Sequence, residues 1–203
     1  MSNIFSAAQF LKTVVKFADL PTSEGHEIAF LGRSNVGKSS TINALTQQRG
    51  LARTSKTPGR TQAINIFTLK PATLKLIDLP GYGFAKAPPA VIKEWHMLID
   101  EYLRHRPCLA GLVLIMDIRH PLQGMDQAML DWLLRSETPV HLVLNKCDKL
   151  SRMQGQITMQ KLETALADYP LVSMQLFSAF RKIGLEELRK KLIGWFELPA
   201  NVT

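Results

Sequence analysis

The residues whose types and spacing most clearly indicate chemistry form the segment GRSNVGKS at positions 32–39. This segment fits the pattern G-x-x-x-x-G-K-[ST], in which the N–H groups of a loop and of a helix N-terminus converge on one phosphate group. The pattern predicts that Lys38 contacts the β- and γ-phosphates of a nucleotide and that the Ser39 hydroxyl ligates Mg²⁺. The sequence therefore predicts a phosphate-binding loop, which by itself does not indicate the base.

The elements that must position this loop lie directly on either side of it. Residues 27–31 (EIAFL) read as a short buried strand, and residues 39–45 (SSTINAL) read as the first turns of a helix. Gly32 and Gly37 allow backbone angles and a close approach to the phosphate that a Cβ atom would obstruct. A strand, a loop and a helix in this order make a chance match to the pattern much less plausible.

Strand-like and helix-like segments alternate along the rest of the chain, which favours an α/β, doubly wound fold. We expect a mostly parallel, mixed sheet of roughly six strands, in which the continuous apolar runs 109–116 and 140–144 are central strands covered on both faces. The other expected strands are 27–31, 63–69, 73–77 and 171–177. The expected helices are 39–45, 89–103, 125–135, 158–167 and 185–196.

The first 20 residues carry spaced apolar side chains without a continuous apolar core, which suggests a short amphipathic helix rather than a signal peptide. We therefore expect residues 1–24 to form a helical extension packed on a single domain that spans residues 25–203. No apolar run approaches the ~20 residues that a transmembrane helix requires. The expected location is the cytoplasm.

The chain of 203 residues has a net charge of +8, which favours an acidic partner such as RNA, DNA or an anionic membrane. Each basic cluster taken alone can equally be solvated surface charge. The clusters are Arg49/Arg53/Lys56/Arg60, Arg104/His105/Arg106, and Arg181/Lys182 with Arg189/Lys190/Lys191. Cys108 and Cys147 lie outside any metal-ligand spacing and are expected to be free thiols.

A second set of polar residues follows the predicted strand 73–77. Asp78 at the strand end can hold Mg²⁺ through a water molecule, and the Gly81 N–H group can reach a γ-phosphate. Leu79 and Pro80 complete this tetrapeptide. Aspartate and glycine are also common at strand ends as turn residues, so this segment carries little weight alone.

Two further segments follow strands and indicate the base. After strand 140–144, the Asp148 carboxylate can accept hydrogen bonds from N1–H and the 2-amino group of guanine, whereas adenine would leave it buried and unpaired. Asn145 would brace the neighbouring loops and the Lys146 stem could cover the base. After strand 171–177, the Ala179 N–H group could meet guanine O6. For both segments the alternative is a plain polar turn.

With these segments in this order, the chain resembles the translation-factor-related P-loop GTPases over nearly its whole length. The segments GRSNVGKSS, SKTPGRTQAINIF and DLPGYGFA resemble more narrowly those of the EngB/YsxC (YihA-type) GTPase family. The resemblance implies the three-layer GTPase fold, GTP hydrolysis and a role in assembly of the large ribosomal subunit. By older naming of the family, it also implies a role in cell division and septation.

The resemblance also implies the set of nucleotide contacts. Thr61 matches the switch-I threonine that reaches Mg²⁺ and the γ-phosphate, although Thr57 in the same polar loop is a competing candidate. Cys147 and Phe180 depart mildly from the family pattern without removing a side-chain ligand. The magnesium ligands are then Ser39, Thr61 and Asp78. The nucleotide contacts are Gly32, Arg33, Ser34, Asn35, Val36, Gly37, Lys38, Ser39, Ser40, Gly59, Arg60, Thr61, Gln62, Asp78, Leu79, Pro80, Gly81, Asn145, Lys146, Cys147, Asp148, Ser178, Ala179 and Phe180.

The implied reaction is in-line attack of water on the γ-phosphate, with charge stabilised by Lys38, Mg²⁺ and loop N–H groups. Tyr82 stands where Ras-like enzymes carry the glutamine that orients this water, so slow intrinsic turnover is expected. The side chain of Asn35 could compensate by coordinating K⁺ beside the phosphates, or it could simply brace the loop. The residues expected to act in catalysis are thus Lys38, Thr61 and Asn35.

Three functions compete at this point. The first is a slow GTPase switch that binds the large ribosomal subunit or its rRNA, and the second is a guanine-nucleotide-dependent RNA- or ribosome-binding module in which hydrolysis is incidental. The third, a P-loop ATPase or kinase, conflicts with Asp148. In each case we expect a monomer without a transmembrane segment.

Overall fold

The computed structural model of the protein describes residues 4–52, 63–83 and 88–197. Its centre is a seven-stranded sheet with the strand order β1-β3-β4-β2-β5-β6-β7. Strands β2, β4, β5, β6 and β7 are parallel, whereas β3 is antiparallel to β4 and β1 is antiparallel to β3. The strands are β1 (Gln9–Val14), β2 (His26–Gly32), β3 (Ile64–Thr68), β4 (Leu74–Asp78), β5 (Leu109–Asp117), β6 (Val140–Asn145) and β7 (Val172–Leu176).

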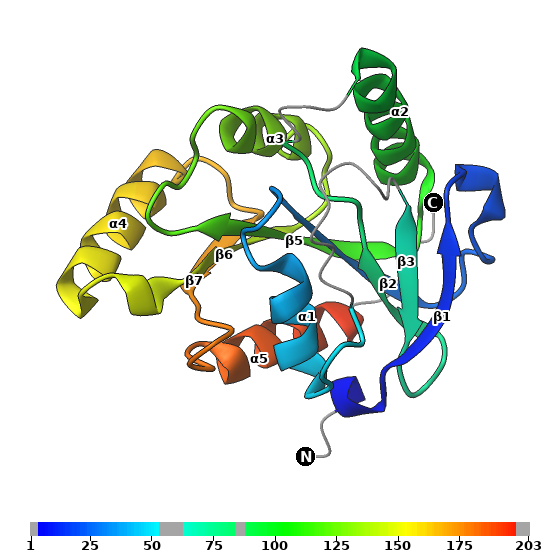
Figure 1. Cartoon of the computed structure of the whole chain (residues 1–203), viewed down its shortest axis with the longest axis horizontal. Helices are drawn as coiled ribbons and strands as arrows, with labels where there is room; N and C mark the ends of the chain where they lie inside the picture. The colour runs from blue at the N-terminus through cyan, green and yellow to red at the C-terminus, as the bar shows by residue number, and fades with distance from the viewer. Residues whose placement is uncertain (1–3, 53–62, 84–87, 198–203) are drawn as a thin grey trace.

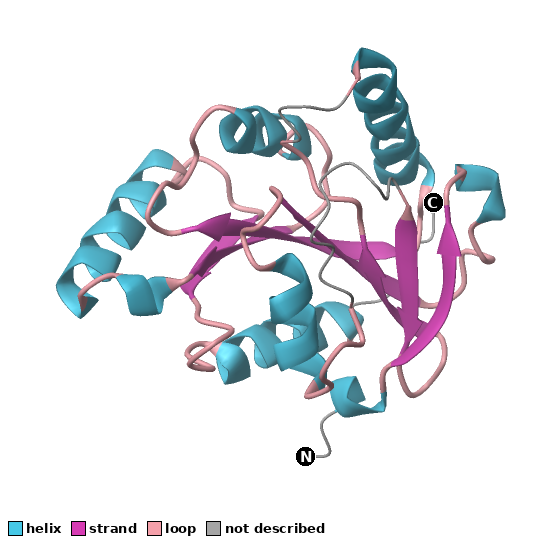
Figure 2. Ribbon diagram, viewed as in Figure 1, coloured by secondary structure: helices cyan, strands magenta, loops and turns pink. Residues whose placement is uncertain are grey.

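Helices cover both faces of this sheet, so the α/β, three-layer architecture is confirmed (Figure 1). Helices α1 and α5 lie on one face and α2 and α3 on the other, while α4 lies beside β7 (Figures 1 and 2). The helices are α1 (Lys38–Thr46), α2 (Pro89–His105), α3 (Met125–Leu133), α4 (Arg152–Ala165) and α5 (Leu185–Phe196). Among the described helices, none combines the length and the hydrophobicity needed to cross a bilayer.

The predicted helix over the first 20 residues is wrong. Two short 3-10 helices, η1 (Ile4–Ala7) and η2 (Phe17–Asp19), flank β1, which adds a seventh strand to the roughly six expected. The backbone of β1 pairs with β3, and the Phe10 ring packs against Phe67 at 6.1 Å between centroids. Backbone pairing with the open edge of β3 thus outweighs the helical spacing of the apolar residues. The domain boundary predicted after residue 24 stays a prediction.

The start of α4 also differs from the prediction, which placed the helix at residues 158–167. The helix begins at Arg152 because Ser151 and Gln154 form a capping box. The Gln154 N–H group donates to Ser151 Oγ at 3.2 Å, and the Ser151 N–H group donates to Gln154 Oε1 at 3.1 Å. The spacing S-x-x-Q is a helix-start signal that the hydrophobic pattern alone does not reveal.

The central strands are buried on both faces, which explains their continuous apolar runs. In β2, for example, the side chains of residues 28–31 are fully buried. Because these strands are parallel, their carboxyl ends all reach the same edge of the sheet. Any side chain or loop that follows a strand is therefore brought to this edge.

The opposite, amino edge of the sheet is held by a buried ion pair. Arg106 makes a bidentate ion pair with Glu27, with its Nε 2.9 Å from Oε2 and one terminal nitrogen 2.6 Å from Oε1. The Tyr102 hydroxyl also donates to Glu27 Oε2, at 2.9 Å. All three residues are buried. Burial, followed by the nearby Glu27 carboxylate, raises the pKa of Tyr102 well above its usual value.

Two of the arginines assigned to basic surface clusters are therefore internal, which is a correction to the sequence analysis. Arg106 pairs with Glu27, and Arg189 is buried against α1, where it donates to the Leu45 carbonyl oxygen at 3.1 Å and pairs with Glu186. Hydrophobic spacing did not mark either position as buried. The charge available to a nucleic acid is correspondingly smaller than the sequence suggests.

Replacing Glu27 with alanine should strongly destabilise the fold, because Arg106 would remain buried without a counter-ion. Removing one partner of a buried pair costs about 3–5 kcal/mol in the free energy of unfolding. The matched control is Arg104→Ala, which removes an exposed pair with Asp100 and should cost at most about 0.5 kcal/mol. Urea unfolding at pH 7 measures both losses, and equal losses would contradict the assignment of Glu27 as the internal counter-ion.

Candidate nucleotide-binding site

The loop between β2 and α1 is tightly fitted to the sheet edge at both of its glycines. A Cβ atom on Gly32 would lie 2.7 Å from the Ile115 carbonyl oxygen, and one on Gly37 would lie 2.2 Å from Asn145 Nδ2. Gly37 also has a left-handed φ of +102°, as does Asn35 at +67°. Glycine is therefore required at position 37 for both its backbone angle and the space it leaves.

Helix α1 starts at this loop without a side-chain hydrogen bond from its N-cap residue. Gly37 is the N-cap residue and provides no side-chain hydrogen bond to the helix, while the Thr41 hydroxyl donates to the Gly37 carbonyl oxygen at 3.0 Å. The first amides of any helix have no carbonyl partner within the helix and carry partial positive charge. The loop and the start of α1 thus form an arrangement suited to a phosphate group.

The side chain of Asn145, at the end of β6, joins this loop to a second one. Its Nδ2 group donates to the Val36 carbonyl oxygen at 2.7 Å, and its Oδ1 atom accepts from the Ala179 N–H group at 3.2 Å. Asn145 is only 3% exposed. The Ala179 amide, expected to meet guanine O6, is thus already bonded to Asn145, and any bond to O6 would be shared.

The two residues that flank Cys147 face different partners. Lys146 has a left-handed φ of +65°, and its Nζ donates to the Asn35 carbonyl oxygen at 2.9 Å. Asp148 lies in the short 3-10 helix η3 (Cys147–Lys149), and its Oδ1 accepts from the Ser178 hydroxyl at 2.5 Å. Ser178 therefore orients the Asp148 carboxylate, so the segments after β6 and β7 act together.

The segment after β4 lies directly against the phosphate-binding loop. The Tyr82 N–H group donates to the Gly32 carbonyl oxygen at 3.3 Å, and the Ser34 N–H group donates to the Tyr82 carbonyl oxygen at 3.0 Å. A Cβ atom on Gly81 would lie 3.1 Å from the Gly32 carbonyl oxygen. Gly81 is thus adjacent to the loop, as a contact with the γ-phosphate would require.

Asp78, at the start of this segment, is buried and forms an ion pair with Lys38. Its second oxygen accepts from Asn65 Nδ2 at 3.4 Å. A buried carboxylate paired with the lysine of the phosphate-binding loop suits Mg²⁺, which typically binds one or two carboxylates together with phosphate oxygens and water. These residues therefore fit a Mg²⁺ ion that enters with a nucleotide.

The side chain of Tyr82 points into the core rather than along the loop. Its hydroxyl donates to Asp126 Oδ1 on α3 at 2.7 Å, and its ring lies 6.2 Å from that of Trp95. Burial, followed by the Asp126 carboxylate, raises the pKa of Tyr82 well above its usual value. Tyr82 is therefore held away from the place where a water-orienting glutamine would act.

Asp126 is fully buried, and its Oδ2 atom has no hydrogen-bond partner within the described part of the chain. Burial raises its pKa, although the hydrogen bond from Tyr82 acts in the opposite direction. The sequence analysis assigned Asp126 no role, because an aspartate in the first turn of a helix is normally explained by its favourable interaction with the helix dipole.

Some of the predicted contacts lie outside the described residues, and one is exposed. Residues 59–62, which include Thr61, and the competing Thr57 lie outside the described residues. Phe180 is 78% exposed, and the Arg181 guanidinium lies 5.2 Å from its ring centroid. The other predicted contacts, in segments 32–40, 78–81, 145–148 and 178–179, are brought together at the carboxyl edge of the sheet by the bonds described above.

The sequence analysis missed Asn65 and Asp117. Asn65 contacts Asp78 from the neighbouring strand β3, and Asp117 ends β5 and forms an ion pair with Lys146 at 3.0 Å. A signal for Asp117 was available, since it follows the apolar run 109–116 in the way that Asn145 follows its own strand.

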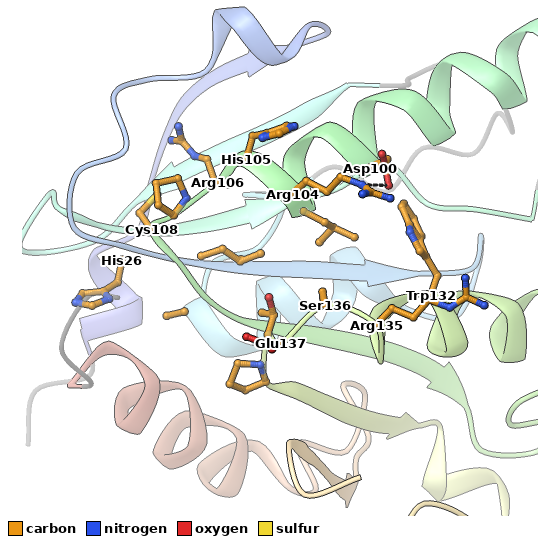
Figure 3. A pocket seen from close by; sticks show the side chains of 16 residues that line it. His26, Asp100, Arg104, His105, Arg106, Cys108, Trp132, Arg135, Ser136 and Glu137 are labelled. Carbon is orange, nitrogen blue, oxygen red and sulfur yellow. Dashed lines mark hydrogen bonds and ion pairs between the residues drawn. The ribbon is translucent and has the colours of Figure 1, made fainter. Parts of the chain in front are cut away.

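A separate pocket opens at the amino edge of the sheet, between the ends of α2 and α3 (Figure 3). Its cationic groups are largely balanced, because Arg104 pairs with Asp100 and Arg106 pairs with Glu27. The remaining charged groups, Arg135 and Glu137, have opposite signs. This pocket therefore gives little support to nucleic-acid binding through the cluster Arg104/His105/Arg106.

The fold and the four converging loops define a nucleotide-binding protein of the P-loop GTPase class. A family model described as "50S ribosome-binding GTPase" matches residues 27–146. Among curated proteins, the probable GTP-binding protein EngB of Thiobacillus denitrificans is 50% identical over 199 residues, covering 98% of this chain and 96% of that protein. EngB of Coxiella burnetii is 48% identical over 193 residues, covering 95% of this chain and 94% of that protein.

Solved structures agree with this result. A crystal structure of a probable GTP-binding protein engB has a TM-score of 0.69 and 25% identity, covering 84% of this chain and 98% of that chain. Aquifex aeolicus Era, with a TM-score of 0.66 and 18% identity over 88% of this chain and 61% of its own, shares the fold. The chain belongs to the EngB family of P-loop GTPases, and it is therefore an enzyme that hydrolyses GTP.

Replacing Asn145 with alanine should weaken GDP binding at least about tenfold, because it leaves the buried Val36 carbonyl oxygen and the partly buried Ala179 N–H group without their partner, and an unpaired buried polar group costs about 1–3 kcal/mol. Asn43→Ala is a matched control, since Asn43 also makes two bonds to backbone groups, at 2.9 and 2.8 Å to Ala52, but lies outside the site. Calorimetric titration with GDP measures both dissociation constants. Equal constants for the two variants would show that Asn145 does not brace the site.

Proposed function

We propose that this GTPase hydrolyses GTP slowly and acts in the cytoplasm as a nucleotide-controlled switch in assembly of the large ribosomal subunit. The matching family model is described as ribosome-binding, and the net charge of +8 favours a partner rich in phosphate groups. The role in cell division and septation that the family resemblance implies is part of the same proposal. The partner is the large subunit or its rRNA, and the protein acts as a monomer.

The observation that carries the proposal is that the segment which carries Asp148 is bonded to the phosphate-binding loop. Asn145 and Lys146 both bond to this loop, and Ser178 orients the Asp148 carboxylate. In our proposal the carboxylate accepts from N1–H and the 2-amino group of guanine, and the Lys146 stem covers the base. An adenine base has no donor at N1, so it would leave the carboxylate unpaired.

For hydrolysis, the residues around Lys38 bind and orient the triphosphate. Lys38 would leave its ion pair with Asp78 to contact the β- and γ-phosphates, and Asp78, the Ser39 hydroxyl and Thr61 are the residues that would hold the metal. Mg²⁺, when bound, neutralises charge that develops on the phosphate oxygens. The loop amides and the Gly81 N–H group orient the γ-phosphate for in-line attack by water.

A second function is favoured by Tyr82. Its side chain is bonded to Asp126 and is 4% exposed, so it offers no group that orients the attacking water. Nucleotide occupancy alone would then control ribosome binding, and hydrolysis would be incidental. Single-turnover hydrolysis with and without large ribosomal subunits separates the two functions, because acceleration by the subunit supports the switch and constant rates support the binding module.

The protein should co-sediment with large ribosomal subunits when a non-hydrolysable GTP analogue is bound and should be released when GDP is bound. We expect binding to weaken steeply as salt is raised from about 50 to 200 mM, because phosphate contacts release counter-ions. Lys38→Ala, which removes the phosphate-binding cation, is expected to lose the nucleotide dependence. Binding that is the same with both nucleotides would contradict the switch.

Potassium dependence is the specific prediction for Asn35. If its side chain coordinates K⁺ beside the phosphates, turnover by the wild-type protein should be several-fold faster in KCl than in NaCl. Asn35→Gly should abolish this difference, and glycine is the suitable substitution because the residue has a φ of +67°. Equal rates of the wild-type protein in the two salts would leave Asn35 as a bracing residue only.

A further inference from the structure

Asp117 lies at the carboxyl end of β5, directly beside Asn145 in the register of the sheet. The Arg119 Nε atom donates to Asp117 Oδ1 at 2.9 Å, and a terminal nitrogen of Arg119 donates to Oδ2 at 2.6 Å. The Arg119 backbone N–H group also donates to Oδ1, at 3.1 Å. The hydrogen bond from Arg119, and then that from Lys146, hold the pKa of Asp117 well below its usual range against the effect of burial.

Lys146 connects this carboxylate to the phosphate-binding loop. Its Nζ lies 3.0 Å from Asp117 Oδ2 and donates to the Asn35 carbonyl oxygen at 2.9 Å. The side chain of Lys146 is 31% exposed and that of Asp117 is 8% exposed, so the pair lies at the wall of the site. One ammonium group therefore spans from the end of β5 to the loop that holds the phosphates.

The position of Lys146 also affects the base site. Lys146 is the N-cap residue of η3, which carries Asp148, and its left-handed backbone sets the direction in which η3 leaves β6. Displacement of the ammonium group would release the Asn35 carbonyl oxygen on one side and loosen the N-cap residue of η3, two positions before Asp148, on the other. The phosphate and base contacts therefore depend on one counter-ion.

We propose that Asp117 is a positioning residue for guanine-nucleotide binding, which holds the Lys146 ammonium group between the phosphate-binding loop and the base site. This inference rests on the proposed assignment of Lys146 and Asp148 to the base. Arg119 has a different part: its side chain is 43% exposed and contacts Asp117 from the solvent side. Loss of Arg119 leaves the bond between Asp117 and Lys146 in place.

The test is the rate at which fluorescent GDP and a fluorescent GTP analogue dissociate from the full chain. Asp117→Asn keeps the size of the side chain and an oxygen for the Arg119 N–H group but removes the charge that attracts Lys146. We expect both nucleotides to leave faster by on the order of tenfold, since changes at a binding site act mainly on dissociation. The accompanying loss of activity should appear as a higher KM with little change in kcat. Arg119→Ala, the matched control, should change the dissociation rates by less than about twofold.

A double-mutant cycle distinguishes positioning from general stabilisation of the turn. Lys146→Met should accelerate release, and adding Asp117→Asn to it should cause no further acceleration, because the two residues act through one contact. Rates are measured well below the melting temperature of each variant. Additive effects, or dissociation from Asp117→Asn at the wild-type rate, would overturn the inference.

Asp148→Ala distinguishes failure of this inference from failure of the site on which it rests. Release that is fast in Asp148→Ala but unchanged in Asp117→Asn would overturn the positioning role and leave the proposed base site standing. Unchanged release in Asp148→Ala would overturn the proposed base site itself, and with it the role of Asp117. Fast release in both variants, with a non-additive cycle, is the expected result.

Discussion

The pair of hydrogen bonds made by the Asn145 side chain is the interaction on which the rest of the site depends. One bond holds the Val36 carbonyl oxygen and the other holds the Ala179 N–H group, so a single buried amide links loops that follow β2, β6 and β7. The amide approaches so closely that position 37 must be glycine. The shape of the phosphate-binding loop therefore depends both on its own sequence and on a residue more than 100 positions away.

The site has a braced part and a part that must rearrange. Asn145 and Lys146 brace the phosphate-binding loop, and Ser178 orients the Asp148 carboxylate, through bonds among residues that end or follow β6 and β7. The segment after β4 is different, because in the proposed mechanism the ion pair between Asp78 and Lys38 would give way to a triphosphate and Mg²⁺. The bond from Tyr82 to Asp126 ties the same segment to α3.

Much of the fold was predictable because its signals are local. The motif at residues 32–39 and the apolar runs of the buried strands can each be recognised from adjacent residues. The six strands expected from the sequence are all present. The late start predicted for α4 reflects a missed local signal, the capping box of Ser151 and Gln154. Most other failures concern partners that are distant in sequence: β1 is a strand because the edge of β3 is open, and Arg106 is internal because Glu27 faces it. Asp126 was missed because its role depends on a hydrogen bond from Tyr82, which lies on a loop distant in sequence.

Competition binding among GTP, ATP and xanthosine triphosphate, with the wild-type protein and Asp148→Asn, tests the central claim most directly. We predict that the wild-type protein prefers GTP to ATP by about 10⁴-fold, because a site built for hydrogen-bond donors rejects a base that lacks them. Asp148→Asn should bind GTP more weakly and xanthosine triphosphate more tightly than the wild-type protein does, because the 2-oxo group of xanthine can accept a hydrogen bond from the new amide. Comparable binding of ATP and GTP, or full retention of GTP by Asp148→Asn, would contradict the account.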